Sequence, residues 1–135
     1  MKRALHIIII ILSTLFSSSL SAGVVERIYI ATDKNVYIAG EDILMSLYCF
    51  SFDRDNNRSL SDISSVGYIE FRNSEGIVAT QKIGIENGRG AGLIELSPNL
   101  PTGNYALVAY TSQNINEVGF YPETKVISID RKSVV

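Results

Sequence analysis

Apolar and polar residues alternate along most of this chain in short segments. Because successive side chains of a strand point to opposite faces, the segment 43–51 presents two different surfaces. One face carries Ile43, Met45, Leu47 and Cys49, and the other carries Leu44, Ser46, Tyr48 and Phe50. The first face is the better candidate for the core. After the first 22 residues, no long stretch keeps the 3.6-residue apolar period of a helix, so the pattern predicts a β protein.

Seven segments show this strand pattern, and residues typical of turns separate them. Three of the later ones place apolar side chains on one face and polar ones on the other, which indicates one solvated face. This number of strands in one domain favours an all-β, immunoglobulin-like antiparallel β-sandwich. The predicted strands are Glu26–Ala31, Ile43–Ser51, Val66–Arg72, Ile77–Ile85, Gly90–Leu96, Asn104–Thr111 and Thr124–Asp130.

Three connections between these strands have a clear character. Asn73-Ser74-Glu75-Gly76 predicts a tight hairpin, and Glu86-Asn87-Gly88-Arg89 contains an Asn-Gly pair suited to positive φ. We expect both to join antiparallel neighbours. The segment Phe52–Ser65, rich in Asp, Asn, Arg and Ser, is the longest connection, and it is the place where we expect mobility and contact with a partner.

The first residues have the composition of an export signal. Met1-Lys2-Arg3 is basic, the run up to Leu12 is apolar, and small residues follow from Ser17 to Gly23. The apolar run is shorter than the roughly 20 residues of a membrane-spanning helix. We therefore predict a signal peptide over 1–22, cleaved near Ser21–Gly23 and leaving no transmembrane span, then a sandwich domain over 23–131 and a tail or linker over 132–135.

Charge and composition exclude several classes of function. The chain has 12 basic and 14 acidic residues and a formal net charge of −2, and this mild acidity argues against binding nucleic acid. Cys49 is the single cysteine, so no internal disulfide forms, and its place on the apolar face suggests a buried hydrophobe and not a nucleophile. His6 is the single histidine and lies in the predicted signal, so the exported domain has no imidazole for a triad or a zinc site.

Two further segments have some features of ligand sites. Asp53-Arg54-Asp55-Asn56-Asn57 has oxygen ligands at alternating positions, but Arg58 and Ser64 stand where a calcium loop needs glycine and glutamate. A solvated loop is the better interpretation. The glycines of the segment 84–92 are not followed by a helix or a Lys-Ser/Thr pair, so phosphate binding is not supported. Glu41 and Asp42 diverge on entering a strand, so we expect them to solvate the corner and to form no catalytic pair.

A set of short motifs runs through the chain. They are Thr32-Asp33-Lys34, Tyr37, Gly40-Glu41-Asp42-Ile43, Leu100-Pro101, Gly103-Asn104-Tyr105, Ala109-Tyr110-Thr111 and the segment 120–129. Together they resemble the second macroglobulin domain of alpha-macroglobulin-like proteins, in the form carried by large envelope proteins of Bacteroidota-type bacteria, and the resemblance covers nearly all of the chain after residue 22. The residue types themselves indicate that Asp33–Gly40 is a structural corner. We expect Asp33 to accept backbone N–H groups, Gly40 to take a left-handed conformation and Tyr37 to cap the core.

The resemblance also bears on function. Such proteins usually contain several sandwiches in series, so we expect this chain to be either a stand-alone remnant or a piece of a longer multidomain protein. The Cys-Gly-Glu-Gln thioester of covalent protease-trapping relatives is absent. Tyr105 opens the sixth strand where sandwich domains place a tyrosine that bonds to nearby backbone, so we expect a structural role for it.

These observations lead to one functional hypothesis and two alternatives. We expect an exported, non-enzymatic module with a structural or protein-interaction role in the bacterial cell envelope, in the periplasm or at the outer membrane or cell surface. It would have no catalytic residues, no cofactor and no metal, and its partner would be a protein or a neighbouring envelope domain. The alternatives are an endopeptidase inhibitor of the alpha-macroglobulin type, and a glycan- or peptide-binding module that uses Tyr48, Tyr68, Tyr110 and Tyr121.

Overall fold

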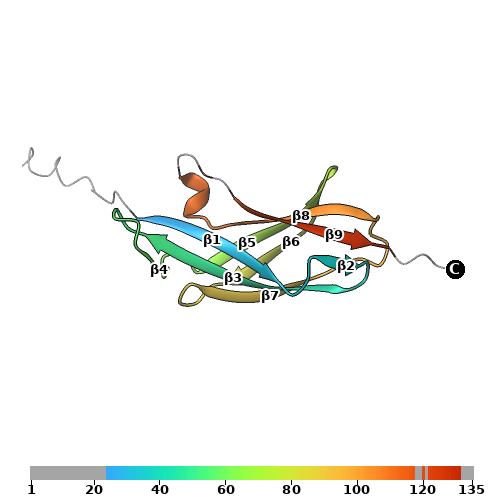
Figure 1. The fold of residues 1–135 in the computed structure, drawn as a ribbon, viewed down its shortest axis with the longest axis horizontal. Coiled ribbons are helices and arrows are strands. Elements are labelled where there is room, and N and C mark those ends of the chain that lie inside the picture. Colours follow the sequence, from blue (N-terminus) through green and yellow to red (C-terminus); the bar gives the residue numbers. More distant parts are fainter. Residues whose placement is uncertain (1–23, 118–119, 121, 132–135) are drawn as a thin grey trace, which may run out of the picture.

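The computed structural model describes residues 24–117, 120 and 122–131. The predicted signal peptide, the tail 132–135 and Tyr121 lie outside the described residues. Within them, the chain folds into nine strands in two facing sheets, elongated so that β1 starts at one end of the long axis and β9 finishes at the other (Figure 1). The described part contains no α-helix, and its one helical element is the 3-10 turn η1 (Asn114–Asn116).

One sheet has four strands and is built around β3 (Asp42–Phe52). On one side, β3 pairs antiparallel along its length with β1 (Val25–Thr32). On the other side it pairs first with β7 (Arg89–Glu95) and then with the three-residue β4 (Arg58–Leu60). β4 lies inside the segment 52–65 that the sequence predicted to be a long loop.

The other sheet has five strands in the order β2-β9-β8-β5-β6. Four of them pair antiparallel, with bounds β5 Val66–Asn73, β6 Gly76–Gly84, β8 Gly103–Tyr110 and β9 Glu123–Asp130. The fifth, β2 (Val36–Ile38), runs parallel to β9. The seven predicted strands are thus present, with no bound shifted by more than one residue. The prediction missed β2 and β4 and expected purely antiparallel pairing.

The space between the sheets is filled with hydrocarbon. The face of β3 chosen from the alternation is buried, and β5 and β9 contribute the inward faces that the pattern predicted. Two rings from the five-stranded sheet, Phe71 and Tyr105, stack with centroids 4.9 Å apart. The buried apolar set is Ile28, Ile30, Tyr37, Ile43, Met45, Leu47, Cys49, Ile69, Phe71, Ile83, Ile85, Ile94, Leu96, Leu100, Tyr105, Leu107, Ala109, Ile127 and Ile129.

One of the two predicted hairpins is confirmed and the other is wrong. Ser74 and Glu75 form the tip of the β5–β6 hairpin, where the Asn73 side chain accepts from the Glu75 N–H at 2.9 Å. The Asn87-Gly88 turn has positive φ at both residues, as expected, but it leads from one sheet into the other. β6 pairs with β5 and β7 with β3, and a single bridge, Glu86 to Arg89, joins the turn.

Two glycines at the start of β7, just after this turn, explain the crossing. A Cβ on Gly92 would lie 2.7 Å from the Ile83 side chain, and one on Gly90 would lie 2.6 Å from the Gly84 carbonyl oxygen. Bare backbone at these positions lets β7 pass close over the inward face of β6. The glycine-rich segment therefore serves strand packing between the two sheets.

Tyr105 confirms the structural role expected for it. Its hydroxyl donates to the Pro101 carbonyl oxygen at 2.8 Å, four residues upstream, while its ring is buried against Phe71. This contact ties the turn before β8 to the strand itself, as the tyrosine corner of a sandwich does. Within the described residues, no helix has the length and hydropathy needed to cross a membrane.

Candidate functional site

The side chains that were candidates for chemistry make structural contacts in the fold. Cys49 is completely buried, and burial, with the Glu26 carboxylate nearby, raises the pKa of its thiol to about 12. A thiol with such a pKa stays protonated at neutral pH, and it is the thiolate that acts as nucleophile. Cys49 therefore behaves as the small buried hydrophobe that its position in the sequence suggested.

The Asp53 carboxylate forms hydrogen bonds within its own loop. Asp53 accepts backbone N–H bonds from Asp55 and Asn57, each at 2.9 Å, and the Asn57 side-chain amide at 3.1 Å. These bonds, the backbone one from Asn57 first, lower the pKa of Asp53 below its ordinary value. Its oxygens thus shape the turn. In the described ranges, no group of three or more His, Cys, Asp or Glu side chains is arranged to hold a metal ion.

The Asp33–Gly40 corner is a compact polar cluster around Tyr37. The Tyr37 hydroxyl donates to Asp33 Oδ1 and accepts the Lys34 backbone N–H at 3.0 Å. Asp33 also accepts the Leu44 N–H at 3.2 Å, as predicted, and the hydrogen bond from Tyr37 is the main cause that lowers the pKa of Asp33. Burial of the ring, with Asp33 beside its hydroxyl, raises the pKa of Tyr37 to about 12. Gly40 has φ 95°, the left-handed conformation expected there.

Glu41 belongs to the same corner and has no catalytic partner in it. Its Oε2 accepts the Ile38 backbone N–H at 2.9 Å and forms an ion pair with Lys34 Nζ, also at 2.9 Å. The backbone hydrogen bond from Ile38 is the main cause that lowers the pKa of Glu41. The sequence suggested that Glu41 and Asp42 solvate the corner, whereas Glu41 in fact closes the exposed edge of β2.

A buried carboxylate that the sequence analysis missed lies at the opposite end of the sandwich. Glu26, with 0% of its surface exposed, points between the sheets from the start of β1. It accepts hydroxyl bonds from Ser61 (2.6 Å), Ser64 (2.5 Å) and Thr111 (2.8 Å), and a backbone N–H from Ser64 (3.3 Å). A buried charge is tolerated when hydrogen bonds replace its water shell. Here one carboxylate joins its own strand to two distant parts of the chain, the segment 61–64 and Thr111. We name these four residues the Glu26 cluster.

The Glu26 cluster changes the interpretation of the segment 52–65. Ser61 and Ser64 are buried in it, and the Ser61 N–H donates to the Cys49 carbonyl at 2.9 Å. The second half of this segment is therefore anchored to the core, contrary to the predicted mobility. The sequence carried one signal for the cluster, since Glu26 shares the inward face of its strand with Ile28 and Ile30.

The four tyrosines proposed as a binding surface do not form one. Tyr68 and Tyr110 stack on the outer face of the five-stranded sheet with centroids 5.5 Å apart, and the Tyr110 hydroxyl donates to Glu70 at 3.2 Å. Tyr48 projects from the other sheet, on the outer face of β3. Tyr121 lies outside the described residues. The three described tyrosines therefore lie on two opposite surfaces of the sandwich.

The outer face of the four-stranded sheet exposes several large apolar side chains. Tyr29, Tyr48 and Arg89 lie side by side across three strands, as do Leu44 and Leu93 across β3 and β7. Large apolar side chains that gather on one exposed face of a sheet point to a contact. We call this surface the apolar face, and it consists of Val25, Tyr29, Leu44, Tyr48, Leu60 and Leu93, all at least 36% exposed.

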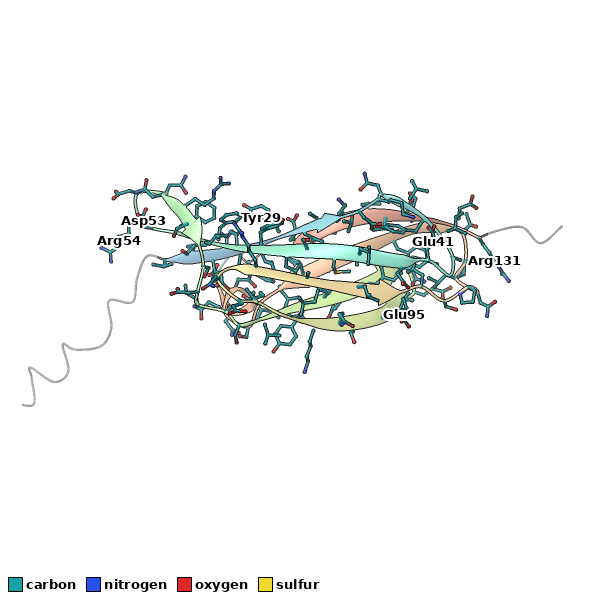
Figure 2. All side chains as sticks on the ribbon, turned by 90° about the horizontal axis from the view of Figure 1, so that it is seen from below. Tyr29, Glu41, Asp53, Arg54, Glu95 and Arg131 are labelled. Carbon is teal, nitrogen blue, oxygen red and sulfur yellow. The ribbon has the colours of Figure 1, made fainter. Side chains whose placement is uncertain are left out.

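A shallow hollow lies beside the apolar face near the Asp53 loop. Its volume is about 310 Å³, and Val25, Arg27, Tyr29, Phe52, Asp53 and Asn56 line it. Figure 2 shows Asp53 and Arg54 at this end of the sandwich, and Glu41 and Arg131 at the other end. Arg27 bonds to Glu117 at 2.8 Å, so its charge is already compensated. The hollow extends the apolar face toward the loop that the sequence proposed for partner contact.

Comparison with known proteins places the fold. No protein-family model matches the chain, and no curated protein matches it. Among solved structures, Salmonella alpha-2-macroglobulin reacted with methylamine aligns with a TM-score of 0.60 at 18% identity, over 83% of this chain and 7% of that one. The native conformation of E. coli alpha-2-macroglobulin aligns with a TM-score of 0.58 at 14% identity, over 82% of this chain and 6% of that one.

These likenesses establish a fold and leave activity open. A variant of the Salmonella protein gives the same result, with a TM-score of 0.59 at 17% identity. The chain thus has the β-sandwich fold of one domain of bacterial alpha-2-macroglobulins and spans about 6–7% of their length. The resemblance found in the sequence is confirmed at the level of this fold.

Glu26→Gln is expected to destabilise the domain by about 2–3 kcal/mol, because an amide cannot accept all the hydroxyl bonds of the Glu26 cluster and a buried donor is left unpaired. Urea unfolding followed by circular dichroism measures the free energy of unfolding. Glu75→Gln, at the exposed hairpin tip, is the matched control and should change it little. Equal stability of the two variants would show that the cluster does not hold the fold.

Alkaline pH is expected to weaken the fold. The folded pKa values of Tyr37 and Cys49, each about 12, lie above their ordinary values of 10.0 and 9.0. Their contribution to stability is therefore complete below pH 9 and is lost as the pH rises toward 12. Urea unfolding between pH 8 and pH 12 should show a falling free energy of unfolding, and the fall should be smaller for Tyr37→Phe. A constant value for the original protein would contradict this assignment.

Proposed function

We propose that this chain is an exported, non-catalytic sandwich module of the bacterial cell envelope that binds a neighbouring protein domain through the apolar face. The apolar face is the observation that carries the proposal. Leu44 and Leu93 are cross-strand partners and remain 51% and 40% exposed, although the core beneath them is completely buried. Covering such side chains would stabilise a complex by roughly 25 cal/mol for each Å² of apolar surface removed from water.

The occupant we infer is a second folded domain with an apolar surface of its own. Tyrosine and arginine, which are enriched at the energetic centres of protein interfaces, stand among the aliphatic residues at Tyr29, Tyr48 and Arg89. The comparisons support this choice, because the aligned alpha-2-macroglobulins are far longer chains in which this fold is one part. Location in the periplasm or at the outer membrane or cell surface follows from the proposed export.

The structural contacts of the reactive side chains support a non-catalytic role. Cys49 is buried and protonated, Asp53 accepts bonds from its own loop, and Glu26 is surrounded by hydroxyls. Each of them stabilises the fold through its contacts. No observation on this chain favours protease inhibition over the module role.

A photo-crosslinking residue at position 93, introduced in the cells that make the protein, is expected to give one discrete adduct with a protein partner. Leu44→Asp in the same chain should abolish that adduct, because a charge would then occupy the centre of the contact. Val126, 62% exposed on the outer face of the other sheet, is the matched control position and should give none. Equal labelling at 93 and 126, or no adduct at either, would refute the proposed contact.

Export is expected to remove the first residues. Mass spectrometry of the protein released from the envelope should give a chain that starts between Ser21 and Gly23. Ile9→Arg, which interrupts the apolar run, should leave the uncleaved chain in the cytoplasm. Recovery of the original 135-residue chain from the cytoplasm would show that the segment 1–22 is not a signal peptide.

A further inference from the structure

The β6 strand forms an open edge of the five-stranded sheet. It has nine residues, Gly76–Gly84, and β5 is the one strand to which it is bonded in the described part of the chain. Outside that ladder, no described backbone hydrogen bond involves the residues 77–84. A strand of this length with a free row of N–H and C=O groups is a template for pairing with another strand.

The β1 edge and the short β2 edge each meet a carboxylate of the same chain. On β1, Glu117 accepts the Glu26 N–H at 3.3 Å. On β2, Glu41 accepts the Ile38 N–H at 2.9 Å. In the described part of the chain, no carboxylate accepts a backbone N–H from residues 77–84, and this distinguishes the β6 edge from those of β1 and β2.

The side chains of β6 do little to repel an incoming strand. The strand has no proline, and Lys82 is its one charged residue. The Lys82 ammonium lies 5.8 Å from the centre of the Tyr68 ring, over its own sheet. Ile77 and Val78, at a local register shift, remain 54% and 39% exposed. Lysine is a common edge protector, but here it is turned back onto the neighbouring strand.

We infer that the β6 edge binds the β6 edge of a second copy of this chain, giving a two-fold dimer with one continuous ten-stranded sheet. This inference does not depend on the proposed function, because it concerns the other sheet. An antiparallel pair related by a two-fold axis keeps outward residues opposite outward residues. A register centred on Thr80 meets this condition and places each Lys82 opposite Val78 of the other copy, so no like charges face one another.

The proposed register is centred on the most regular part of β6. The local register shift near Ile77 and Val78 lies at one end of this part, and β7 covers Ile83 and Gly84 at the other end. Thr80 lies between these limits, is exposed, and would face its own copy, a cross-strand pair that stabilises sheets. One short strand pair buries less than a standard interface, so we expect a weak dimer with a Kd on the order of 100 μM.

Thr80→Cys tests this pairing directly. Cys49 is buried and protonated, so position 80 would provide the one reactive thiol among the described residues. Mild oxidation, or a short bismaleimide reagent, should convert the purified variant into a covalent dimer in high yield at several hundred micromolar. Thr124→Cys, an exposed threonine on the same outer face but on β9, three strands away from β6, is the matched control and should remain monomeric.

The non-covalent state provides the second measurement. Sedimentation equilibrium of the original protein should show concentration-dependent dimerisation, and Thr80→Lys should weaken it at least tenfold by placing two like charges opposite each other. Thr124→Lys should leave it unchanged, and circular dichroism confirms that both variants fold. A monomer at all concentrations, or equal cross-linking at 80 and 124, would overturn the inference. Dimerisation that Thr80→Lys does not affect would also overturn it. None of these three results changes the crosslinking that we expect at position 93.

Discussion

The carboxylate of Glu26 is the constraint around which one end of this molecule is organised. A charge removed from water needs hydrogen-bond donors, and the chain supplies them from two distant places, the segment with Ser61 and Ser64 and the end of β8 at Thr111. These segments must converge for the carboxylate to be satisfied. The long connection after β3 is therefore held against the core at its second half, and the end of β8 is held against the start of β1. Loss of any one donor leaves the same charge less well solvated, so the contacts depend on each other.

Polar contacts of two tyrosines have a similar structural role at the opposite end of the sandwich. Tyr37 bonds to Asp33 and Tyr105 bonds to the Pro101 carbonyl, and both rings lie in the core near the end of β9. Between the two ends the interior is hydrocarbon. This arrangement lets hydrophobic burial supply most of the stability, while a few directional bonds at each end fix where strands start and turn. It also explains why the potentially reactive groups Cys49, Glu26 and Tyr37 are structural, because each lies inside the packed layer.

Alternation along the sequence was sufficient to predict the sandwich, its seven longer strands and the inward face of β3. It could not reveal β2 and β4, because three residues offer too few positions for a period of two to be visible. The Asn-Gly turn was predicted correctly as a local conformation, yet its strands separate because pairing is decided by Ile83 packing under Gly90 and Gly92. The inward position of Glu26 was visible beside Ile28 and Ile30. Its partners were not, since they lie 35 to 85 residues away.

The mild acidity of the chain takes on a structural meaning once the sheet edges are compared. Glu41 and Glu117 each accept a backbone N–H from an edge strand, so part of the acidic excess protects edges that would otherwise pair with other chains. A carboxylate is well suited to this task because it accepts bonds without donating any, and its charge discourages further association. Among the described residues no such carboxylate lies beside β6, and this is a property of that edge, distinct from the general composition. The same physical rule accounts for the carboxylates at the β1 and β2 edges and makes the β6 edge a place for strand pairing.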